Sequence, residues 1–314
     1  MELLFKTNII ALVGGGQNPK FPLNKVIIWD DQQKKQICEL RLKSTINNVK
    51  LKKDIIFIIC QNKIYVFKLY SLDMLSEPLE TFDNPKGIFA LSLIENKTII
   101  AYPFFRTKGY IQIKSFGEKS NTLIINAHDS KIFFLTMNRN GTLIASCSEK
   151  GTLIRLFRSD NGELVQELRR GSDHAQIYCI CFDAFSKFIA CSSDKKTIHI
   201  FSLRKANKSF KDEKEEKDEN DKDNFFSKKN DYEEPKNPKS IFSTFGKLFK
   251  IKDWYFNSEW SLAQYRIKEV KSICHFGPDK TIIVISNNGK YYQARFDPSL
   301  GGECFHIKTL DLNI

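Results

Sequence analysis

Two adjacent arginines followed by a glycine, Arg169-Arg170-Gly171, are the residues of this 314-residue chain best suited to binding chemistry. A planar guanidinium group grips phosphate oxygens through two parallel hydrogen bonds. Neighbouring residues of a β-strand point to opposite faces, so the pair predicts two separate anion pockets rather than one. The glycine lets the backbone turn sharply, because it has no Cβ. Taken alone, the triplet also fits two surface arginines that pair with nearby carboxylates.

Residues for catalysis are scarce. The chain has five histidines, and it lacks a G-x-S-x-G motif, a paired-carboxylate pattern and a P-loop. The triple glycine at 14–16 is typical of a turn, and Trp29-Asp30-Asp31 of a strand end. We therefore expect neither an enzyme nor a cofactor.

Eight cysteines are spread along strand-like segments, and only Cys179 and Cys181 are close in sequence. Their spacing places both on one face of a strand. No C-x-x-C pair or nearby histidine supports a zinc site, so we predict no metal and interpret the cysteines as buried, reduced thiols of a cytosolic protein.

The formal net charge of +12 favours an anionic partner such as nucleic acid or an acidic membrane surface. No 18-residue apolar run or secretory signal is present. Any membrane contact is therefore expected to be peripheral, by a protein of the cytoplasm.

The elements that must position the arginines are β-strands. Short β-branched or aromatic runs, bounded by Gly, Asn, Asp or Lys-rich turns, occur at 25–31, 54–69, 97–103, 110–116, 141–168 and 187–203. They repeat: "GTLIASCSEKGTLIRLF" aligns with "SKFIACSSDKKTIHIFSL", and 280–296 has the same rhythm. A repeat of about 40 residues is typical of four-stranded propeller blades. Units beginning near residues 2, 36, 79, 122, 163 and 259 predict an all-β, WD40-like β-propeller.

An insertion at 204–258 separates the blades of 1–203 from a last blade predicted at 259–314. Its first part, 204–234, is a mixed-charge run that predicts disorder. Its second part, 235–258, contains an amphipathic helical pattern with an apolar face and lysines, typical of contact with an anionic membrane. A helix packed on the propeller or a protein-docking peptide remains an alternative. The predicted membrane-insertion residues are Ile241, Phe242, Phe245, Lys247, Leu248, Phe249 and Lys250.

These segments resemble the PROPPIN family, the β-propellers that bind polyphosphoinositides, called WIPI proteins in animals. The resemblance is carried by "LVGGGQNPKFPLNKVIIWDD", "NKIYVF", "NPKG", "SEKGTLIR", "ELRRG", "IYCICF" and "SSDKKTIHIF", and it covers the chain except 204–240. It is strongest to the WIPI3/4-like branch. The family propeller has seven blades, one of them before "LVGGG". Since only six are recognisable here, we expect the first blade to be missing through truncation, which the intact mass of the native protein would test.

The resemblance implies two phosphoinositide sites without catalytic residues. Site 1 comprises His128, Ser146, Ser148, Gly151, Thr152, Arg155 and Arg169. Site 2 comprises Arg170, Gly171, Ser193, Thr197 and His199. The serines and threonines also fit local hydrogen bonding in blade turns, and His199 also fits a satisfied histidine between strands.

The implied function is that of a non-enzymatic adaptor for phosphatidylinositol 3-phosphate and the 3,5-bisphosphate. It would act as a monomer at autophagosomal, endosomal or vacuolar membranes, or at another organelle of a protist. Its partner would be an autophagy lipid-transfer or conjugation-machinery protein. A WD40 interaction scaffold without lipid binding is the alternative. An RNA-binding propeller is a third, although no aromatic platform is interleaved with the basic residues, and we expect no nucleic acid.

Overall fold

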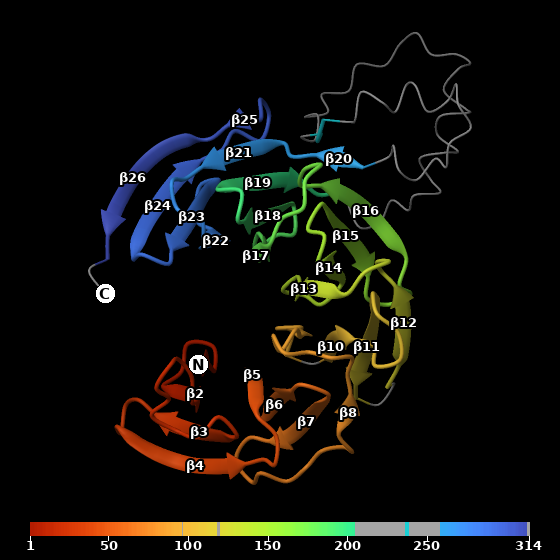
Figure 1. Cartoon of the computed structure of the whole chain (residues 1–314), viewed down its shortest axis with the longest axis vertical. Coiled ribbons are helices and arrows are strands. Elements are labelled where there is room, and N and C mark those ends of the chain that lie inside the picture. The colour runs from red at the N-terminus through yellow and green to blue at the C-terminus, as the bar shows by residue number, and fades with distance from the viewer. Residues whose placement is uncertain (96, 118–119, 205–235, 239–257, 313–314) are drawn as a thin grey trace. The chain divides into compact units, whose positions relative to one another are not determined.

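The computed structural model describes residues 1–95, 97–117, 120–204, 236–238 and 258–312. Every element assigned within these residues is a β-strand, and the strands form six sheets (Figure 1). The chain divides into two compact units, Met1–Ile132 and Phe133–Ile314, which hold three sheets each. The prediction of an all-β fold is confirmed.

The first unit holds three four-stranded sheets whose strands follow one another along the chain. Sheet 1 contains β1 (Glu2–Leu3), β2 (Ile9–Val13), β3 (Lys25–Asp30) and β4 (Lys35–Arg41). Sheet 2 contains β5 (Ile46–Lys52), β6 (Ile55–Cys60), β7 (Lys63–Lys68) and β8 (Leu79–Glu80). Sheet 3 contains β9 (Ala90–Leu91), β10 (Thr98–Pro103), β11 (Tyr110–Phe116) and β12 (Thr122–Asn126).

The second unit holds sheets 4, 5 and 6. Sheet 4 contains β13 (Ile132–Met137), β14 (Leu143–Ser148), β15 (Leu153–Arg158), β16 (Leu164–Arg169) and β20 (Glu259–Trp260). Sheet 5 contains β17 (Ile177–Phe182), β18 (Phe188–Ser193), β19 (Thr197–Ser202), β21 (Ala263–Arg266) and β25 (Gly302–Glu303). Sheet 6 contains β22 (Ser272–Phe276), β23 (Thr281–Ser286), β24 (Lys290–Arg295) and β26 (Phe305–Asp311).

The predicted repeat units are offset by one strand from the sheets. Four of their starting points, near residues 36, 79, 122 and 163, coincide with the last strand of the meander in a sheet: β4, β8, β12 and β16. Each of these units therefore gives its first strand to the preceding sheet, and its remaining strands build the next one. The six sheets agree with the six predicted repeats of a propeller.

The segment after the insertion is distributed over three sheets instead of forming one last blade. Strand β20 pairs in parallel with β16 of sheet 4. Strand β21 then pairs antiparallel with β19 of sheet 5, and β25 pairs in parallel with β21. Sheet 6 is built by strands within 272–295 and by 305–311. The predicted boundary at 259 thus separates strands that complete sheets 4 and 5 from the blades to which they belong.

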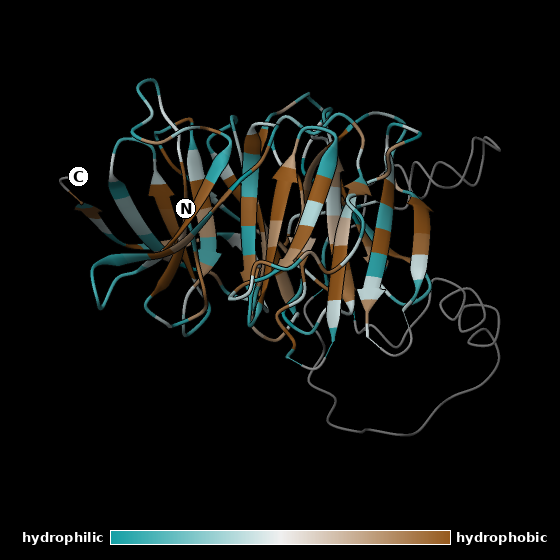
Figure 2. Ribbon diagram, turned by 90° about the horizontal axis from the view of Figure 1, so that it is seen from below, coloured by the Kyte–Doolittle hydropathy of each residue, from teal (hydrophilic) through white to brown (hydrophobic). Residues whose placement is uncertain are grey.

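The hydrophobic core lies between neighbouring sheets of the same unit. Strand β14 is buried along its whole length, and residues of sheets 4 and 5 such as Leu143, Ile154, Ile189 and Phe201 form one cluster. In Figure 2 the apolar residues concentrate in the strands and the polar ones in the connecting loops. Each buried aliphatic or aromatic side chain contributes about 1.5–3 kcal/mol. This packing fixes the strand ends that carry the candidate site.

Candidate functional site

Arg169 and Arg170 lie where β16 ends, at the edge of sheet 4. Arg169 is the last strand residue, opposite Leu153 of β15, and the backbone N–H of Arg170 donates to the carbonyl of Thr152 at 2.9 Å. The two side chains have different partners. Nε of Arg169 donates to Oγ of Ser258 at 2.8 Å, whereas Nε of Arg170 donates to the carbonyl of Gly151 at 2.9 Å. Different partners are what opposite strand faces predict.

The guanidinium of Arg170 is buried and bound by backbone. Arg170 is only 4% exposed, and its Nη2 also donates to the carbonyl of Asp173. Among the described residues, no carboxylate lies within ion-pair distance of it. Burial lowers the pKa of Arg170, while more distant groups such as Asp194 act in the opposite direction. A buried cation that lacks a paired anion is costly, so this position favours an anionic ligand.

The turn beneath Arg170 requires glycine at position 151. Gly151 has φ +62°, and a Cβ there would collide with the carbonyl oxygen of Ala175. Glycine alone therefore lets this turn approach closely enough for its carbonyl to receive Arg170. Gly171 differs: its φ is not positive, and a Cβ would meet nothing within 4 Å. The sharp turn predicted at Gly171 is not a backbone constraint in the structure.

The other predicted residues of site 2 lie in sheet 5. His199, opposite Cys191, is 8% exposed, and its Nδ1 lies 3.1 Å from Oγ of Ser261. Burial, together with the charges of Arg170 and Arg266, lowers the pKa of His199 to about 4. His199 is therefore neutral at neutral pH, and both arginines act on it electrostatically.

The two hydroxyls of site 2 make local hydrogen bonds. Oγ of Ser193 accepts from the N–H of Lys195 at 3.3 Å, and Thr197 donates to the carbonyl of Lys195 at 3.4 Å. This is the local role that the sequence left open for them. Arg266, opposite Thr197 on β21, was missed by sequence reasoning, because the pairing of β21 with β19 is not readable from the repeat.

Site 1 contains a row of side chains across sheet 4. Ser146 on β14 is opposite Arg155 on β15, which is opposite Glu167 on β16. Nε of Arg155 donates to Oε2 of Glu167 at 2.8 Å, and the two side chains are 16% and 7% exposed. Within the described residues, Oε1 of Glu167 has no hydrogen-bond partner. Arg155 thus already has an anionic partner, in contrast to its predicted role at a phosphate.

Ser148 and Thr152 flank the glycine turn at the same end of sheet 4. Ser148 is buried, and its carbonyl accepts from the N–H of Gly151 at 3.0 Å. Thr152 precedes β15 and is partly buried. Both therefore lie within three residues of Gly151, whose carbonyl contacts Arg170. Their hydroxyls remain predicted ligands.

His128 belongs to the first unit. It follows β12, is buried, and its backbone N–H donates to the carbonyl of Gly109 at 2.9 Å. Gly109 has φ +80°, and a Cβ there would collide with the backbone of His128. The local backbone of His128 is thus tightly fixed, and its grouping with Arg169 stays a prediction.

The ends of the insertion are tied to sheet 4. Oε2 of Glu259 accepts from Gln166 at 2.7 Å and from Asn237 at 2.8 Å, and Arg204 donates to Oε1. Ser258, the partner of Arg169, directly precedes this glutamate. Sequence reasoning missed this connection, which brings the return from the insertion next to the first arginine.

The predicted membrane-insertion residues, Ile241, Phe242, Phe245, Lys247, Leu248, Phe249 and Lys250, lie outside the described residues. Within the described ranges, no helix has the length and apolar character needed to cross a bilayer.

Comparisons with known proteins agree with this architecture. The sequence model of the PROPPIN family matches residues 1–313. Autophagy-related protein 18e of Arabidopsis thaliana is 31% identical over 310 residues, 98% of this chain and 74% of the relative. SVP1-like protein 2 of Schizosaccharomyces pombe is 32% identical over 296 residues, 94% of this chain and 78% of the relative.

Solved structures confirm the β-propeller fold. The crystal structure of Hsv2 from Kluyveromyces marxianus superposes with a TM-score of 0.71 at 20% identity, covering 99% of this chain and 84% of that one. A complex of KlAtg21 with the coiled coil of AgAtg16 gives a TM-score of 0.69 at 22% identity, covering 99% and 84%. At these identities the superpositions establish the fold.

Proposed function

Because this chain belongs to the PROPPIN family of phosphoinositide-binding, autophagy-related β-propellers, we propose that it binds phosphatidylinositol 3-phosphate and phosphatidylinositol 3,5-bisphosphate. It acts as a non-enzymatic effector in autophagosome formation or related organelle trafficking. Arg169 serves one headgroup pocket and Arg170 another, one on either side of the end of β16.

The observation that carries this proposal is the Arg170 guanidinium. It is held in place by the carbonyls of Gly151 and Asp173, and no carboxylate of the described residues pairs with it. A phosphate would supply the missing negative charge and accept the remaining N–H bonds, in a charge-assisted interaction. Ser193, Thr197 and His199 are then the polar lining of the second pocket.

The first pocket is proposed to use Arg169 with Ser146, Ser148, Gly151 and Thr152. Arg155 acts differently in this proposal. Because it is paired with Glu167, it supports the strand that ends at Arg169 instead of contacting the headgroup.

Membrane attachment would combine the two pockets with the insertion. Two sites on one molecule bind a membrane through effective concentration. Lysines near an anionic leaflet add roughly 1 kcal/mol each. Binding would thus be peripheral and reversible, at autophagosomal, endosomal or vacuolar membranes. The Atg21–Atg16 coiled-coil complex of a structural neighbour supports, for this chain, a partner from the autophagy machinery.

A liposome flotation assay tests the proposal. The double variant Arg169→Gln, Arg170→Gln is expected to lose flotation with phosphatidylinositol 3-phosphate vesicles while keeping its circular dichroism spectrum. The matched control is Arg139→Gln, Arg158→Gln. It removes the same charge from the opposite end of sheet 4, since Arg158 pairs with Leu143 at the far ends of β14 and β15. The control should float like the unmodified chain.

Three outcomes oppose the proposal. If the double variant of Arg169 and Arg170 floats as well as the unmodified chain, the two arginines do not form the lipid site. No flotation of the unmodified chain with any 3-phosphorylated lipid favours an interaction scaffold. Equal loss in both double variants indicates general charge attraction, and competition by RNA would then identify a nucleic-acid partner.

A further inference from the structure

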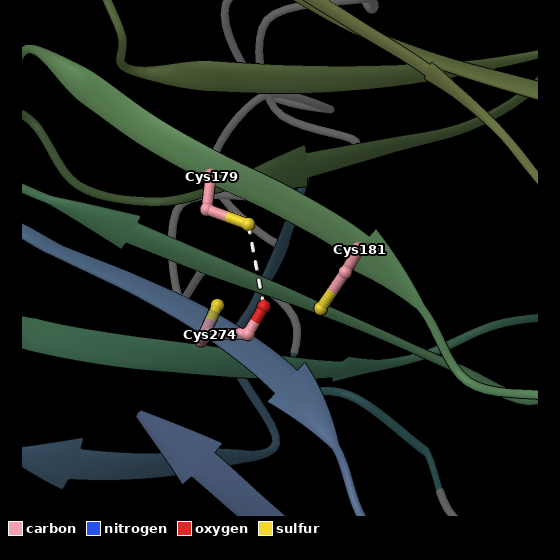
Figure 3. A group of neighbouring side chains, drawn as sticks. All are labelled: Cys179, Cys181 and Cys274. Atoms are coloured by element: carbon pink, nitrogen blue, oxygen red, sulfur yellow. Dashed lines mark hydrogen bonds between the residues drawn. The ribbon is translucent and has the colours of Figure 1, made fainter. Parts of the chain in front are cut away.

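Three cysteines of the second unit meet between sheets 5 and 6. Cys179 and Cys181 lie two residues apart on β17, and Cys274 lies on β22 (Figure 3). Their three Sγ atoms all lie within 4.8 Å of one another. The thiol of Cys179 also lies 3.3 Å from the carbonyl oxygen of Cys274. The first two share a strand face, and the third comes from 93 or more residues away, which is why sequence spacing predicted no metal site.

We propose that Cys179, Cys181 and Cys274 bind one thiophilic closed-shell metal ion, Cu(I) or Zn²⁺. The proposal is independent of lipid binding. Thiolates are the protein ligands that select these ions. With metal–sulfur bonds of about 2.3 Å, three sulfurs around one ion lie roughly 3.8–4.0 Å apart. Side-chain rotations that move each Sγ atom by less than about 1 Å would therefore close the site.

The residues around the three cysteines indicate which coordination geometry an ion would have there. Among the described residues, no fourth histidine, cysteine or carboxylate completes the group. His275 is exposed, and its Nδ1 lies 2.8 Å from the carbonyl of Phe276. Phe188 and Phe276 are partly buried and, like Cys179 and Cys181, pack against the apolar cluster that contains Cys274. Three sulfurs in an apolar setting suit trigonal Cu(I), whereas Zn²⁺ would take a water as its fourth ligand.

Two of the three thiols can be reached from outside the fold. Cys179 and Cys181 are partly exposed, so an ion can reach them, while Cys274 is buried. Because a metal-bound cysteine is a thiolate, binding of the ion would release the thiol protons.

The backbone around the cluster is held in register. Oγ of Ser192 on β18 donates to the carbonyl of Ser272 on β22 at 2.7 Å, which fixes the separation of sheets 5 and 6 close to the cysteines. Because β17 and β22 belong to different sheets, a bound ion would link them. It should therefore raise the melting temperature, since it binds the folded chain in preference to the unfolded one.

The experiment uses the full chain, reduced and stripped of metal with a chelator. Zn²⁺ and, under argon with ascorbate, Cu(I) are titrated separately in competition with a colour-forming chelator. We expect one equivalent of ion bound, release of protons and a higher melting temperature. X-ray absorption then distinguishes Cu(I) with sulfur ligands only from Zn²⁺ with an added oxygen.

Serine variants identify the ligands. Cys179→Ser and Cys181→Ser should each bind about 10–100-fold more weakly, because each removes one metal–sulfur bond. Cys38→Ser, a partly exposed cysteine outside the cluster, is the control and should bind like the unmodified chain. Because Cys274 is buried and its variant is at risk of misfolding, the two β17 variants carry the test. Failure to bind either ion at one equivalent, or binding that these two variants leave unchanged, overturns the proposal.

Discussion

Two arginines in or next to sheet 4 are buried with different kinds of partner. In the middle of the sheet, Arg155 pairs with the carboxylate of Glu167 at 2.8 Å. At its end, Arg170 is bound by the carbonyls of Gly151 and Asp173, with no carboxylate of the described chain at ion-pair distance. Backbone carbonyls orient a guanidinium but do not cancel its charge. The charge of the first arginine is therefore neutralised within the protein, whereas the second has no paired carboxylate among the described residues.

This difference suits Arg155 to a structural role and Arg170 to the proposed anion site. A pair neutralised inside the fold contributes to stability only while both partners remain. A cation held by neutral dipoles has a fixed position and an unsatisfied charge, which is the preorganisation that an anion site needs. The two arginines should consequently respond to mutation in different measurements.

The largest expected effect is a loss of folding stability when the Arg155–Glu167 pair is broken. Glu167→Gln leaves Arg155 charged and without its carboxylate, and should reduce the free energy of unfolding by about 3–5 kcal/mol in urea denaturation. The folded fraction should still float with phosphatidylinositol 3-phosphate vesicles, because Arg169 and Arg170 are unchanged.

A paired replacement is the control. Arg155→Met combined with Glu167→Leu removes both charges and should recover most of the lost stability. If Arg170→Gln destabilises the chain as much as Glu167→Gln does, the distinction between the two arginines is wrong.

Sequence reasoning reached the strands and the repeat but not the pairings that close the sheets. The β-branched runs predicted β3, β10 and β11 almost to the residue, because period and turn chemistry are local. The parallel pairing of β20 with β16 joins residues about 90 positions apart and leaves no local signal. The same limit hid Ser258 beside Arg169.

The roles of the candidate site residues stay predictions, but the structure shows what holds some of them. Arg170 is buried against backbone carbonyls, and the turn glycine at 151 is required by its positive φ. The role of Arg155 could not be predicted, since its pairing with Glu167 depends on the register between β15 and β16. The cysteine cluster could not be predicted either, because Cys274 belongs to a different sheet from Cys179 and Cys181.

The turn that holds Arg170 gives the next largest effect. Gly151→Ala forces a side chain into a left-handed position and against the carbonyl of Ala175, and should reduce the free energy of unfolding by about 1–2 kcal/mol. Because the carbonyl of residue 151 positions Arg170, vesicle binding should weaken as well.

Gly171→Ala is the matched control, since its Cβ has open space and no positive φ. It should change stability by less than about 0.5 kcal/mol. Equal effects of the two substitutions would mean that the turn does not position the arginine.

The smallest effect is a pH dependence that reports the charge of Arg170. Burial first, and Arg170 next, lower the pKa of His199 from 6.5 to about 4 in the folded chain. Between these values the unfolded state takes up a proton that the folded state does not, so stability falls as the pH falls. From about pH 6.5 to about pH 5.5, the unmodified chain should lose about 1 kcal/mol more than His199→Gln, measured by urea denaturation.

The Arg170→Gln variant links this titration to the comparison. Without the guanidinium, less positive charge acts on His199, so its pKa should rise toward its usual value and the extra loss of stability should shrink. Titration of the His199 ring protons by NMR measures the shift directly. A pKa unchanged by Arg170→Gln would mean that the charge of Arg170 is already cancelled in the folded chain, and that the two arginines of sheet 4 do not differ as their contacts indicate.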